Sequence, residues 1–414
     1  LDHHQSETKL PSAHSIVNPN RFDDRSDLNY LCAAGVCFMF LIALNKKLRD
    51  RNWFSDNSIN EPELLDILDL VSLGTICDVV PLVGLNRAIV HQGLKIIKKK
   101  KNLGLKTLIE VSNIESKITS YHLGYVLGPR INAGGRVGKS THGANLLLNK
   151  NPKDTFKLAL DLNTFNKERQ ILESELLKKI LNTKYENSSD PVIILHGENW
   201  HEGVIGIIAA RIKEKFNKPA IIISVNKGIG KGSGRSIHGF DLGSTVIGAV
   251  QSGILTKGGG HKMAAGFTIN INKINEFKEF VFKKFKSINI NLEEKKNYYF
   301  DAEIAPSAIN IEFFEKVNLL APFGSGNPEP RFVIRDVKLV NSKIVGEKHI
   351  KNVLVGSDSS TLKTISFNTV ETELGSYLLK KNIKPFDIVG KLSLNEWRGE
   401  RNVEFIIDDI SVIK

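Results

Sequence analysis

At 414 residues the chain is too long for one ordinary hydrophobic core, so we expect two or three domains. Its composition, 41% hydrophobic and 25% charged, is that of a soluble globular protein, and the apolar run at residues 31–44 is too short to span a membrane. The formal charge of +12 favours a polyanionic partner, and the basic excess falls in residues 1–297 because residues 298–414 carry a net charge of −1.

The chain opens with Leu1-Asp2-His3-His4, an acid and two adjacent histidines directly after an apolar residue. This order predicts the end of a buried strand, at the carboxyl edge of a sheet, where open α/β folds bind their ligands. Histidine and carboxylate together suit Mn²⁺ or a similar divalent ion, although a solvated tail would also explain them. Because the chain has no initiator methionine and opens on an apparent strand end, we expect a fragment that lacks its amino-terminal part.

Three cysteines, Cys32, Cys37 and Cys77, lie in apolar runs and form no CxxC pair. Two of them fall within residues 31–49, which we predict to be a core helix. Reduced, buried thiols indicate a cytoplasmic protein, and the sequence contains no signal peptide.

Helical periodicity covers most of residues 12–150, with an amphipathic run at 64–71 that begins after Glu61-Pro62-Glu63. In the apolar segment that follows, residues 74–82, Asp78 is the one acid. Burying a lone carboxylate costs several kcal/mol unless a partner or a metal ion compensates it. Asp78 is therefore a metal ligand, a helix cap or the partner of Arg87.

Residues 128–136 form a glycine-rich segment that contains Arg130, Asn132 and Arg136. We expect a loop whose backbone N–H groups and guanidinium groups hold an anion. An ordinary turn would explain the glycines but not the two arginines beside them.

A long helix is expected after this segment. Asn151 caps it, Pro152 takes its first position and Asp154 lies in its first turn. Apolar residues spaced by three or four extend it to about residue 184, and the polar residues 186–190 follow. We expect this helix to connect two domains.

Predicted strands at residues 192–196 and 220–224 flank a predicted helix at 204–216, which indicates a small α/β domain. His201 lies just before the helix, at an amino terminus that suits an anion.

Two further glycine-rich segments follow in the same predicted domain. Residues 231–236 contain Ser233, Gly234 and Arg235, and residues 258–266 contain His261. We expect two loops past which a phosphate chain runs; the alternative is a pair of tight turns between sheet and helix.

Residues 286–297 are polar and charged, and we expect a linker there. Six short β segments follow, at residues 299–304, 331–340, 350–355, 361–367, 387–394 and 402–410. They predict a small barrel such as the oligonucleotide-binding (OB) fold. A stacking and phosphate-binding surface on it would consist of Trp397, Arg398, Lys343, Lys348 and Lys351, although the net charge here is near zero.

Together these stretches resemble the RecJ branch of the DHH phosphoesterase family, whose members are single-strand-specific 5′→3′ DNA exonucleases. The resemblance rests on LDHH at 1–4, GTICDVVPLVGLNR at 74–87, GPRINAGGR at 128–136 and NWHEGVIGIIAAR at 199–211. It continues with KGSGRS at 231–236, GGGHKMAAG at 258–266, APFGSGNPEP at 321–330 and LNEWRG at 394–399. Gly135 stands where the family pattern usually has alanine.

The resemblance implies an α/β protein with a partial DHH domain at residues 1–150, a connecting helix at 151–185, a DHHA1 domain at 186–290 and an OB-fold barrel at 298–414. It also implies hydrolysis of phosphodiester bonds in DNA repair and recombination, at a two-metal site for Mn²⁺ or Mg²⁺. His3 and Asp78 would be metal ligands, with Asp2 supporting His3 and His4 contacting the phosphate. The implied DNA-binding residues are Arg130, Asn132, Arg136, His201, Ser233, Gly234, Arg235, His261 and Trp397.

The aspartate-rich motifs that precede LDHH in the family are missing from this sequence. We therefore expect an incomplete metal site and no nuclease activity from this chain alone. One rival is a DHH phosphodiesterase of short oligonucleotides or cyclic dinucleotides, which generally lacks the barrel; another is a catalytically inactive DHH scaffold protein. The expected partner is single-stranded DNA, with a single-strand-binding protein and a RecQ-type helicase as further candidates and no membrane.

Overall fold

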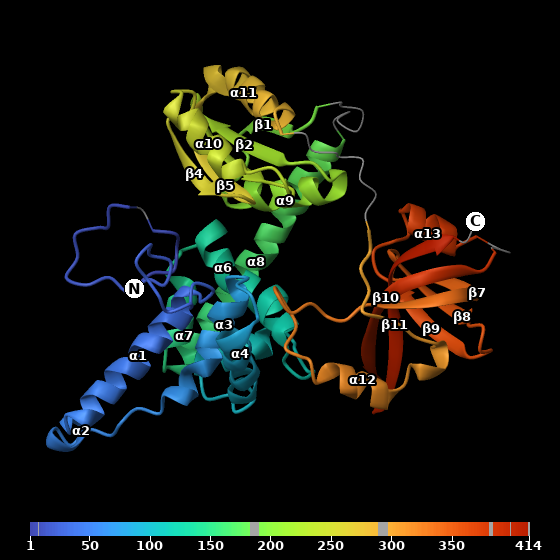
Figure 1. The fold of residues 1–414 in the computed structure, drawn as a ribbon, viewed down its shortest axis with the longest axis horizontal. Helices are drawn as coiled ribbons and strands as arrows, with labels where there is room; N and C mark the ends of the chain where they lie inside the picture. The colour runs from blue at the N-terminus through green and yellow to red at the C-terminus, as the bar shows by residue number, and fades with distance from the viewer. Residues whose placement is uncertain (7, 183–189, 289–296, 381–383, 398, 413–414) are drawn as a thin grey trace. The chain divides into compact units, whose positions relative to one another are not determined.

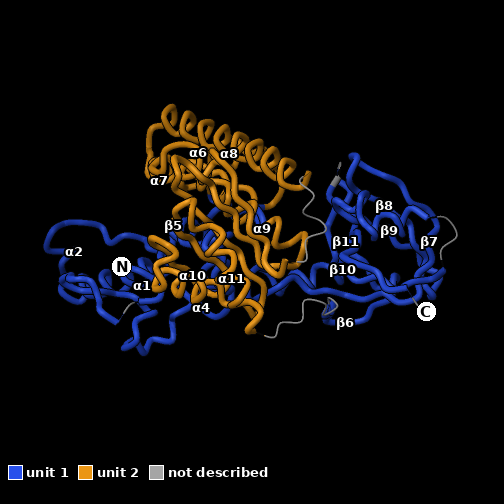
Figure 2. Tube along the Cα trace, turned by 90° about the horizontal axis from the view of Figure 1, so that it is seen from above, with its two compact units in different colours: residues 1–99, 118–123, 296–414 blue, residues 100–117, 124–295 orange. Residues whose placement is uncertain are grey.

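The computed structural model describes residues 1–6, 8–182, 190–288, 297–380, 384–397 and 399–412. The chain forms two compact units, shown in separate colours in Figure 2. The first unit contains residues 1–99, 118–123 and 296–414, and the second contains residues 100–117 and 124–295. Within the described ranges, no helix is both long and apolar enough to cross a membrane.

The amino-terminal part of the first unit is helical from residue 33 onward. Its elements are α1 (Ala33–Asp50), α2 (Trp53–Asp56), the 3₁₀ turn η1 (Leu64–Ile67), α3 (Leu68–Cys77) and α4 (Gly84–Ile97). The predicted core helix is confirmed as α1. The predicted strand end at Leu1–His4 is wrong: in the described part of residues 1–32 no strand forms, and the Asp2 N–H donates to the Val17 carbonyl at 3.1 Å.

Close packing against α1 and α4 holds α3 in position. A Cβ on Gly74 would lie 2.8 Å from Ala34 Cβ, so α1 and α3 approach closely at this point. A Cβ on Gly93 would lie 1.8 Å from Ser72 Oγ, and the Ser72 hydroxyl donates to the Ile89 carbonyl at 3.1 Å between α3 and α4. Helix α3, which Asp78 follows, is therefore held by α1 on one side and by α4 on the other.

The second unit begins with helices. They are α5 (Leu103–Val111), the π-helical turn η2 (His122–Leu127, shared between the units), α6 (Gly128–Val137), α7 (His142–Leu148) and α8 (Pro152–Leu181). Asn151 caps α8 as predicted, accepting from the N–H groups of Lys153 and Asp154. The polar residues 186–190 after this helix lie almost wholly outside the described residues, and so does most of the predicted linker at 286–297.

The glycine-rich segment 128–136 is a helix, not the predicted loop. It forms α6, with Pro129 in the first turn. A Cβ on Gly134 would lie 2.8 Å from the Lys139 carbonyl oxygen and 3.2 Å from Leu162 Cδ2 of α8. The glycine therefore serves close packing of α6 against α8, which sequence alone does not distinguish from a loop.

A five-stranded sheet follows in the second unit (Figure 1). Its elements are β1 (Ile193–Glu198), α9 (Glu202–Phe216), β2 (Ala220–Asn226), β3 (Ile229–Arg235), α10 (Leu242–Gln251), β4 (Lys257–His261), β5 (Ala264–Asn270), the 3₁₀ turn η4 (Ile271–Lys273) and α11 (Ile274–Lys286). The strand order is β1-β2-β3-β5-β4, with β1 and β2 parallel and the other neighbours antiparallel. Helices α10 and α11 pack on one face, and α9 with the end of α8 packs on the other.

The two segments predicted as glycine-rich loops in this domain are largely strands. Residues 231–235 belong to β3, and residues 258–266 form most of the β4–β5 hairpin. A Cβ on Gly232 would lie 2.1 Å from Cζ of the buried Phe267 ring, and one on Gly258 would lie 2.7 Å from Val246 Cγ1. These glycines make room inside the core between the sheet and α10, a demand that does not appear in local sequence.

The carboxy-terminal part of the first unit is a barrel, as predicted (Figure 1). Its elements are β6 (Ala302–Glu303), the 3₁₀ turn η5 (Pro306–Ala308), α12 (Ile311–Asn318), β7 (Phe332–Val345), β8 (His349–Val355), β9 (Thr361–Ser366), α13 (Glu373–Leu378), β10 (Phe386–Trp397) and β11 (Glu400–Val412). Pairing of β10 with β7 closes the order β7-β8-β9-β11-β10 around a core that includes Phe386 and Phe405. Closure by five strands with a helix before the fourth is an OB fold.

We predict that Gly232→Ala lowers the free energy of unfolding of the second unit by about 2 kcal/mol, because the new methyl group overpacks the Phe267 ring. Hydrogen exchange of the β2 and β5 amides would measure this change in the free energy of unfolding. Gly259→Ala, where a Cβ meets no atom within 4 Å, is the matched control and should change it by less than about 0.5 kcal/mol. Equal effects of the two variants would contradict the packing explanation.

Candidate functional site

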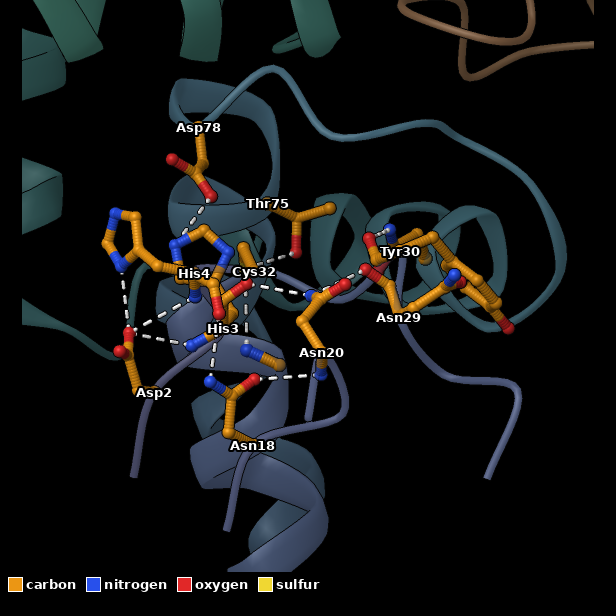
Figure 3. Close-up of polar contacts among 12 residues, drawn as sticks. Asp2, His3, His4, Asn18, Asn20, Asn29, Tyr30, Cys32, Thr75 and Asp78 are labelled. Carbon is orange, nitrogen blue, oxygen red and sulfur yellow. Dashed lines mark hydrogen bonds and ion pairs between the residues drawn. The ribbon is translucent and has the colours of Figure 1, made fainter. Parts of the chain in front are cut away.

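His3 and Asp78 face each other in the first unit (Figure 3). His3 Nε2 lies 3.4 Å from Asp78 Oδ2, and the two side chains are 17% and 41% exposed. Asp78 follows the last residue of α3, and Val79 after it reverses the chain with a φ of 59°. The carboxylate is thus not buried, and Arg87 is not its partner, because the Arg87 guanidinium donates to the Leu320 carbonyl at 2.7 Å.

Asp2 holds the backbone and the ring of the histidine pair. Its Oδ1 accepts from the His3 N–H at 2.7 Å and lies 2.8 Å from His4 Nδ1. The hydrogen bond with the His4 side chain, followed by that with the His3 backbone, lowers the pKa of Asp2 to about 2. Asp2 is therefore ionised at neutral pH, and the His4 side chain, 79% exposed, remains open to solvent.

Two asparagines that the sequence interpretation missed anchor the same segment (Figure 3). The buried Asn18 amide donates to the His4 carbonyl at 2.9 Å, and the Asn20 amide donates to the carbonyls of His3 at 2.8 Å and Asn29 at 3.0 Å. The Asn20 N–H in turn donates to Asn18 Oδ1 at 2.8 Å. The Asn-Pro-Asn order at 18–20 predicts a turn, but it does not indicate which backbone carbonyls the two asparagine side chains bind.

The donor set at His3 and Asp78 fits one side of a divalent-ion site. An imidazole nitrogen and a carboxylate oxygen are ligands that suit Mn²⁺. Among the described residues no group of three or more His, Cys, Asp or Glu side chains could hold a metal ion, so His3 and Asp78 are two candidate ligands that do not complete a site there. Burial, and then the Asp78 charge, raise the pKa of Cys77 to about 11, so the neighbouring thiol is protonated near neutral pH.

A pair of arginines comes together in the second unit. The Arg136 guanidinium donates to the Gly203 carbonyl at 2.9 Å, and Arg235 donates to the Gly234 carbonyl at 2.9 Å and to Ser233 Oγ at 3.4 Å. Burial lowers the pKa of both arginines, and the Arg136 charge lowers that of Arg235 further. In the described parts of the chain no carboxylate forms an ion pair with Arg136 or Arg235, so the pair favours an anion.

Helix α9 packs directly on the Ser233 and Arg235 side chains. A Cβ on Gly206 would lie 2.9 Å from Ser233 Oγ and 3.3 Å from Arg235 Nη2. His201 caps this helix, its Nδ1 accepting from the Gly203 N–H at 3.1 Å. The predicted residues His201, Ser233 and Arg235 therefore lie around the amino-terminal half of α9.

One face of the sheet over β3, β5 and β4 carries small residues in the middle and basic side chains at both sides. Residues paired directly across antiparallel strands present their side chains on the same face. The register gives three rows: Arg235, Ala264 and His261; Ser233, Gly266 and Gly259; and Lys231, Thr268 and Lys257. We call this surface the open strip; the other face of β5 carries the buried core.

The remaining predicted residues have other surroundings. The Arg130 guanidinium donates to Asn163 Oδ1 of α8 at 3.0 Å and to the Val126 carbonyl at 2.7 Å, which makes it a structural link. Asn132 is exposed one turn before Arg136, on the same face of α6.

Gly234 lies on an interior strand, and a Cβ there would be 2.6 Å from Leu242 Cδ2, so its role is packing rather than an open N–H. Trp397 ends β10, but its side chain, like Arg398, lies outside the described residues.

Family models match two regions of the chain: the DHHA1 domain at residues 189–287 and the RecJ OB domain at residues 300–409. The two matches define a DHHA1 protein that carries an OB barrel. The single-stranded-DNA-specific exonuclease RecJ of Escherichia coli is 35% identical over 99% of this chain and 72% of its own length. The same enzyme of Dickeya dadantii is 34% identical with the same coverage. The chain therefore belongs to the RecJ family.

Solved structures agree with this assignment. The crystal structure of RecJ from Thermus thermophilus in complex with Mn²⁺ matches with a TM-score of 0.81 and 27% identity, over 100% of this chain and 58% of that chain. RecJ from the same organism in complex with Mg²⁺ matches with a TM-score of 0.77 and 27% identity, over 96% of this chain and 57% of that chain.

We predict that Asn20→Ala loosens the amino-terminal segment by about 1–2 kcal/mol, because the carbonyls of His3 and Asn29 each lose a hydrogen bond. Hydrogen exchange at the Asp2 amide should be roughly tenfold faster, since about 1.4 kcal/mol corresponds to a factor of ten. Asn57→Ala, which removes a single exposed bond to the Trp53 carbonyl, is the control and should leave this amide unchanged. An unaltered Asp2 amide in Asn20→Ala would refute the anchoring role.

Proposed function

We propose that this chain forms the catalytic and DNA-binding part of a single-stranded-DNA-specific 5′→3′ exonuclease that hydrolyses phosphodiester bonds in DNA repair and recombination. The observation that carries the proposal is the His3–Asp78 pair on a chain of the RecJ family. RecJ structures bound to Mn²⁺ and to Mg²⁺ support either ion as the cofactor.

At the proposed catalytic centre, His3 and Asp78 hold a divalent ion, which when bound would neutralise phosphate charge and acidify a water molecule. The other side chains act around it. Asp2 binds His4 through Nδ1, and this orients the exposed ring so that Nε2 is left for a phosphate oxygen. The ligands that complete the site are not among the described residues.

At the proposed end-binding site, Arg235 and Ser233 hold the 5′-terminal phosphate, and Arg136 adds a second guanidinium. A terminal phosphate carries more charge than an internal phosphodiester, and paired guanidinium groups favour it. The open strip beside them has no side chain larger than threonine along its central strand, β5, so a sugar-phosphate backbone can approach the sheet closely. Lys231, Lys257 and His261 line its sides.

The substrate and partners follow from the same features. The OB barrel supports a polymeric single strand over a short oligonucleotide or cyclic dinucleotide. A single-strand-binding protein and a RecQ-type helicase are the protein partners we propose. Three unpaired cysteines support a reducing, cytoplasmic setting.

We predict that Arg235→Ala removes the preference for 5′-phosphorylated over 5′-hydroxyl single strands. One charge-assisted contact is worth on the order of 2 kcal/mol, or roughly thirtyfold in affinity. Fluorescence anisotropy with a 3′-labelled oligonucleotide, bearing either end, would measure the ratio for parent and variant.

The control for this experiment is Arg211→Ala, which removes the same charge from an exposed position on α9 that pairs with Glu173. It should keep the parent's preference. Should Arg235→Ala discriminate as well as the parent, Arg235 does not recognise the 5′-terminal phosphate, and Arg136 is the next candidate.

We further predict that DNA affinity falls steeply with salt, because bound lysines and arginines displace counterions from the phosphates. Lys257→Gln should reduce the slope of log Kd against log salt by about 0.7, the contribution of one phosphate contact on a single strand. Lys283→Gln, on α11 at the other face of the sheet, is the charge-matched control with an unchanged slope. Equal slopes for the two variants would show that bound DNA does not contact the open strip.

A further inference from the structure

A loop of the carboxy-terminal region contacts the segment that carries Asp78. This loop, residues 320–327, lies between α12 and β7, and it belongs to the same unit as that segment. The Leu82 N–H donates to the Ser325 carbonyl at 2.6 Å, and the Leu82 side chain is 1% exposed. Leu82 is four residues after Asp78, in the short link between α3 and α4.

Two glycines bring the loop close to this link. A Cβ on Gly324 would lie 2.8 Å from Leu82 Cδ1. A Cβ on Gly326 would lie 3.0 Å from Pro81 Cβ, and Gly326 has a φ of 71°, which other residues rarely adopt. Larger residues at these two glycine positions would push the loop and the link apart.

The loop is held together by its own hydrogen bonds. The Asn327 amide donates to the carbonyls of Leu320 at 3.0 Å and Pro322 at 2.9 Å, and the Gly324 N–H donates to the Asn327 carbonyl at 2.9 Å. The Ser120 hydroxyl donates to the Phe323 carbonyl at 2.6 Å. These hydrogen bonds hold the loop in one conformation where it contacts the link.

The link is held from its other side as well. The fully buried Asn86 donates to the carbonyls of Pro81 at 3.0 Å and Tyr30 at 2.8 Å. Pro81 and Leu82 are therefore fixed between α4 and the loop. Only Val79 and Val80 separate them from Asp78, so the loop supports the chain directly after this carboxylate.

We propose that loop 320–327 is a positioning element for Asp78 and that it sets the affinity of the His3–Asp78 pair for a divalent ion. Groups that orient a metal ligand typically change affinity ten- to a hundredfold when they are altered. The inference rests on the proposed metal role of Asp78. It assigns the region before the barrel a part in metal binding besides any part in DNA binding.

The test uses the 414-residue chain and a Mn²⁺ titration followed by electron paramagnetic resonance of the unbound ion. Asp78→Asn is the reference for loss of the ligand. We expect Gly324→Ala and Gly326→Ala to raise the Kd for Mn²⁺ about tenfold, with faster hydrogen exchange at the Leu82 amide. Gly346→Ala is the control, because Gly346 also has a positive φ, 58°, but a Cβ there meets only His349 at 3.7 Å.

A second substitution that restores the Kd for Mn²⁺ would show that a glycine variant acts by shifting the loop and not by destabilising the whole protein. Leu82→Val removes the atom that the Gly324→Ala methyl group meets, so the double variant should recover the parent's Kd. If the glycine variants fail to fold, Asn327→Ala replaces them, since it removes two hydrogen bonds of the loop without a clash and should raise the Kd in the same direction.

The outcomes distinguish this inference from the proposed function. Mn²⁺ binding that Asp78→Asn leaves unchanged would overturn the metal assignment and the positioning role with it. Binding that is weakened by Asp78→Asn but unchanged by the folded loop variants would overturn the positioning role alone.

Discussion

Close approach of backbone segments at positions that admit no Cβ is the constraint on which both units depend. In the first unit it brings α1, α3 and α4 together at Gly74 and Gly93, and this packing holds the helix that Asp78 follows. In the second unit it places the Phe267 ring under β3 at Gly232, and α9 against the Ser233 and Arg235 side chains at Gly206. Protein interiors are packed as densely as organic crystals, so these contacts leave little freedom for the polar groups beside them.

This constraint explains which parts of the fold the sequence predicts. Long periodic segments and capped ends are local signals, and α1, α8 and most barrel strands lie within a few residues of the expected positions. The three glycine-rich segments were wrongly predicted as loops because glycine permits a turn and equally makes room for a neighbour. Which of the two applies at Gly134 or Gly232 depends on a side chain far away in sequence, Leu162 or Phe267.

The sequence likewise predicts some features of the candidate site and misses others. The types of its residues, an Asp-His-His start and a lone acid in an apolar run, are visible in sequence, and so are the arginines beside glycine. Their neighbours are not: Asn18 and Asn20 act through the His3 and His4 carbonyls, which carry no side-chain signature. Likewise, the alignment of Arg235 with His261 across Ala264 follows from strand register, which depends on three strands at once. The division into domains at residues 150, 185 and 290 stays a prediction.

Among the described residues, strand β4 ends the sheet on one side, so no strand pairs with its outer edge there. Its sequence is short, with Lys257 and His261 at the two ends and three glycines between them. The Lys257 charge repels a second copy of the same edge, and glycines offer it no side chains to pack against. The glycines and the lysine of β4 thus also protect this domain from edge-to-edge aggregation.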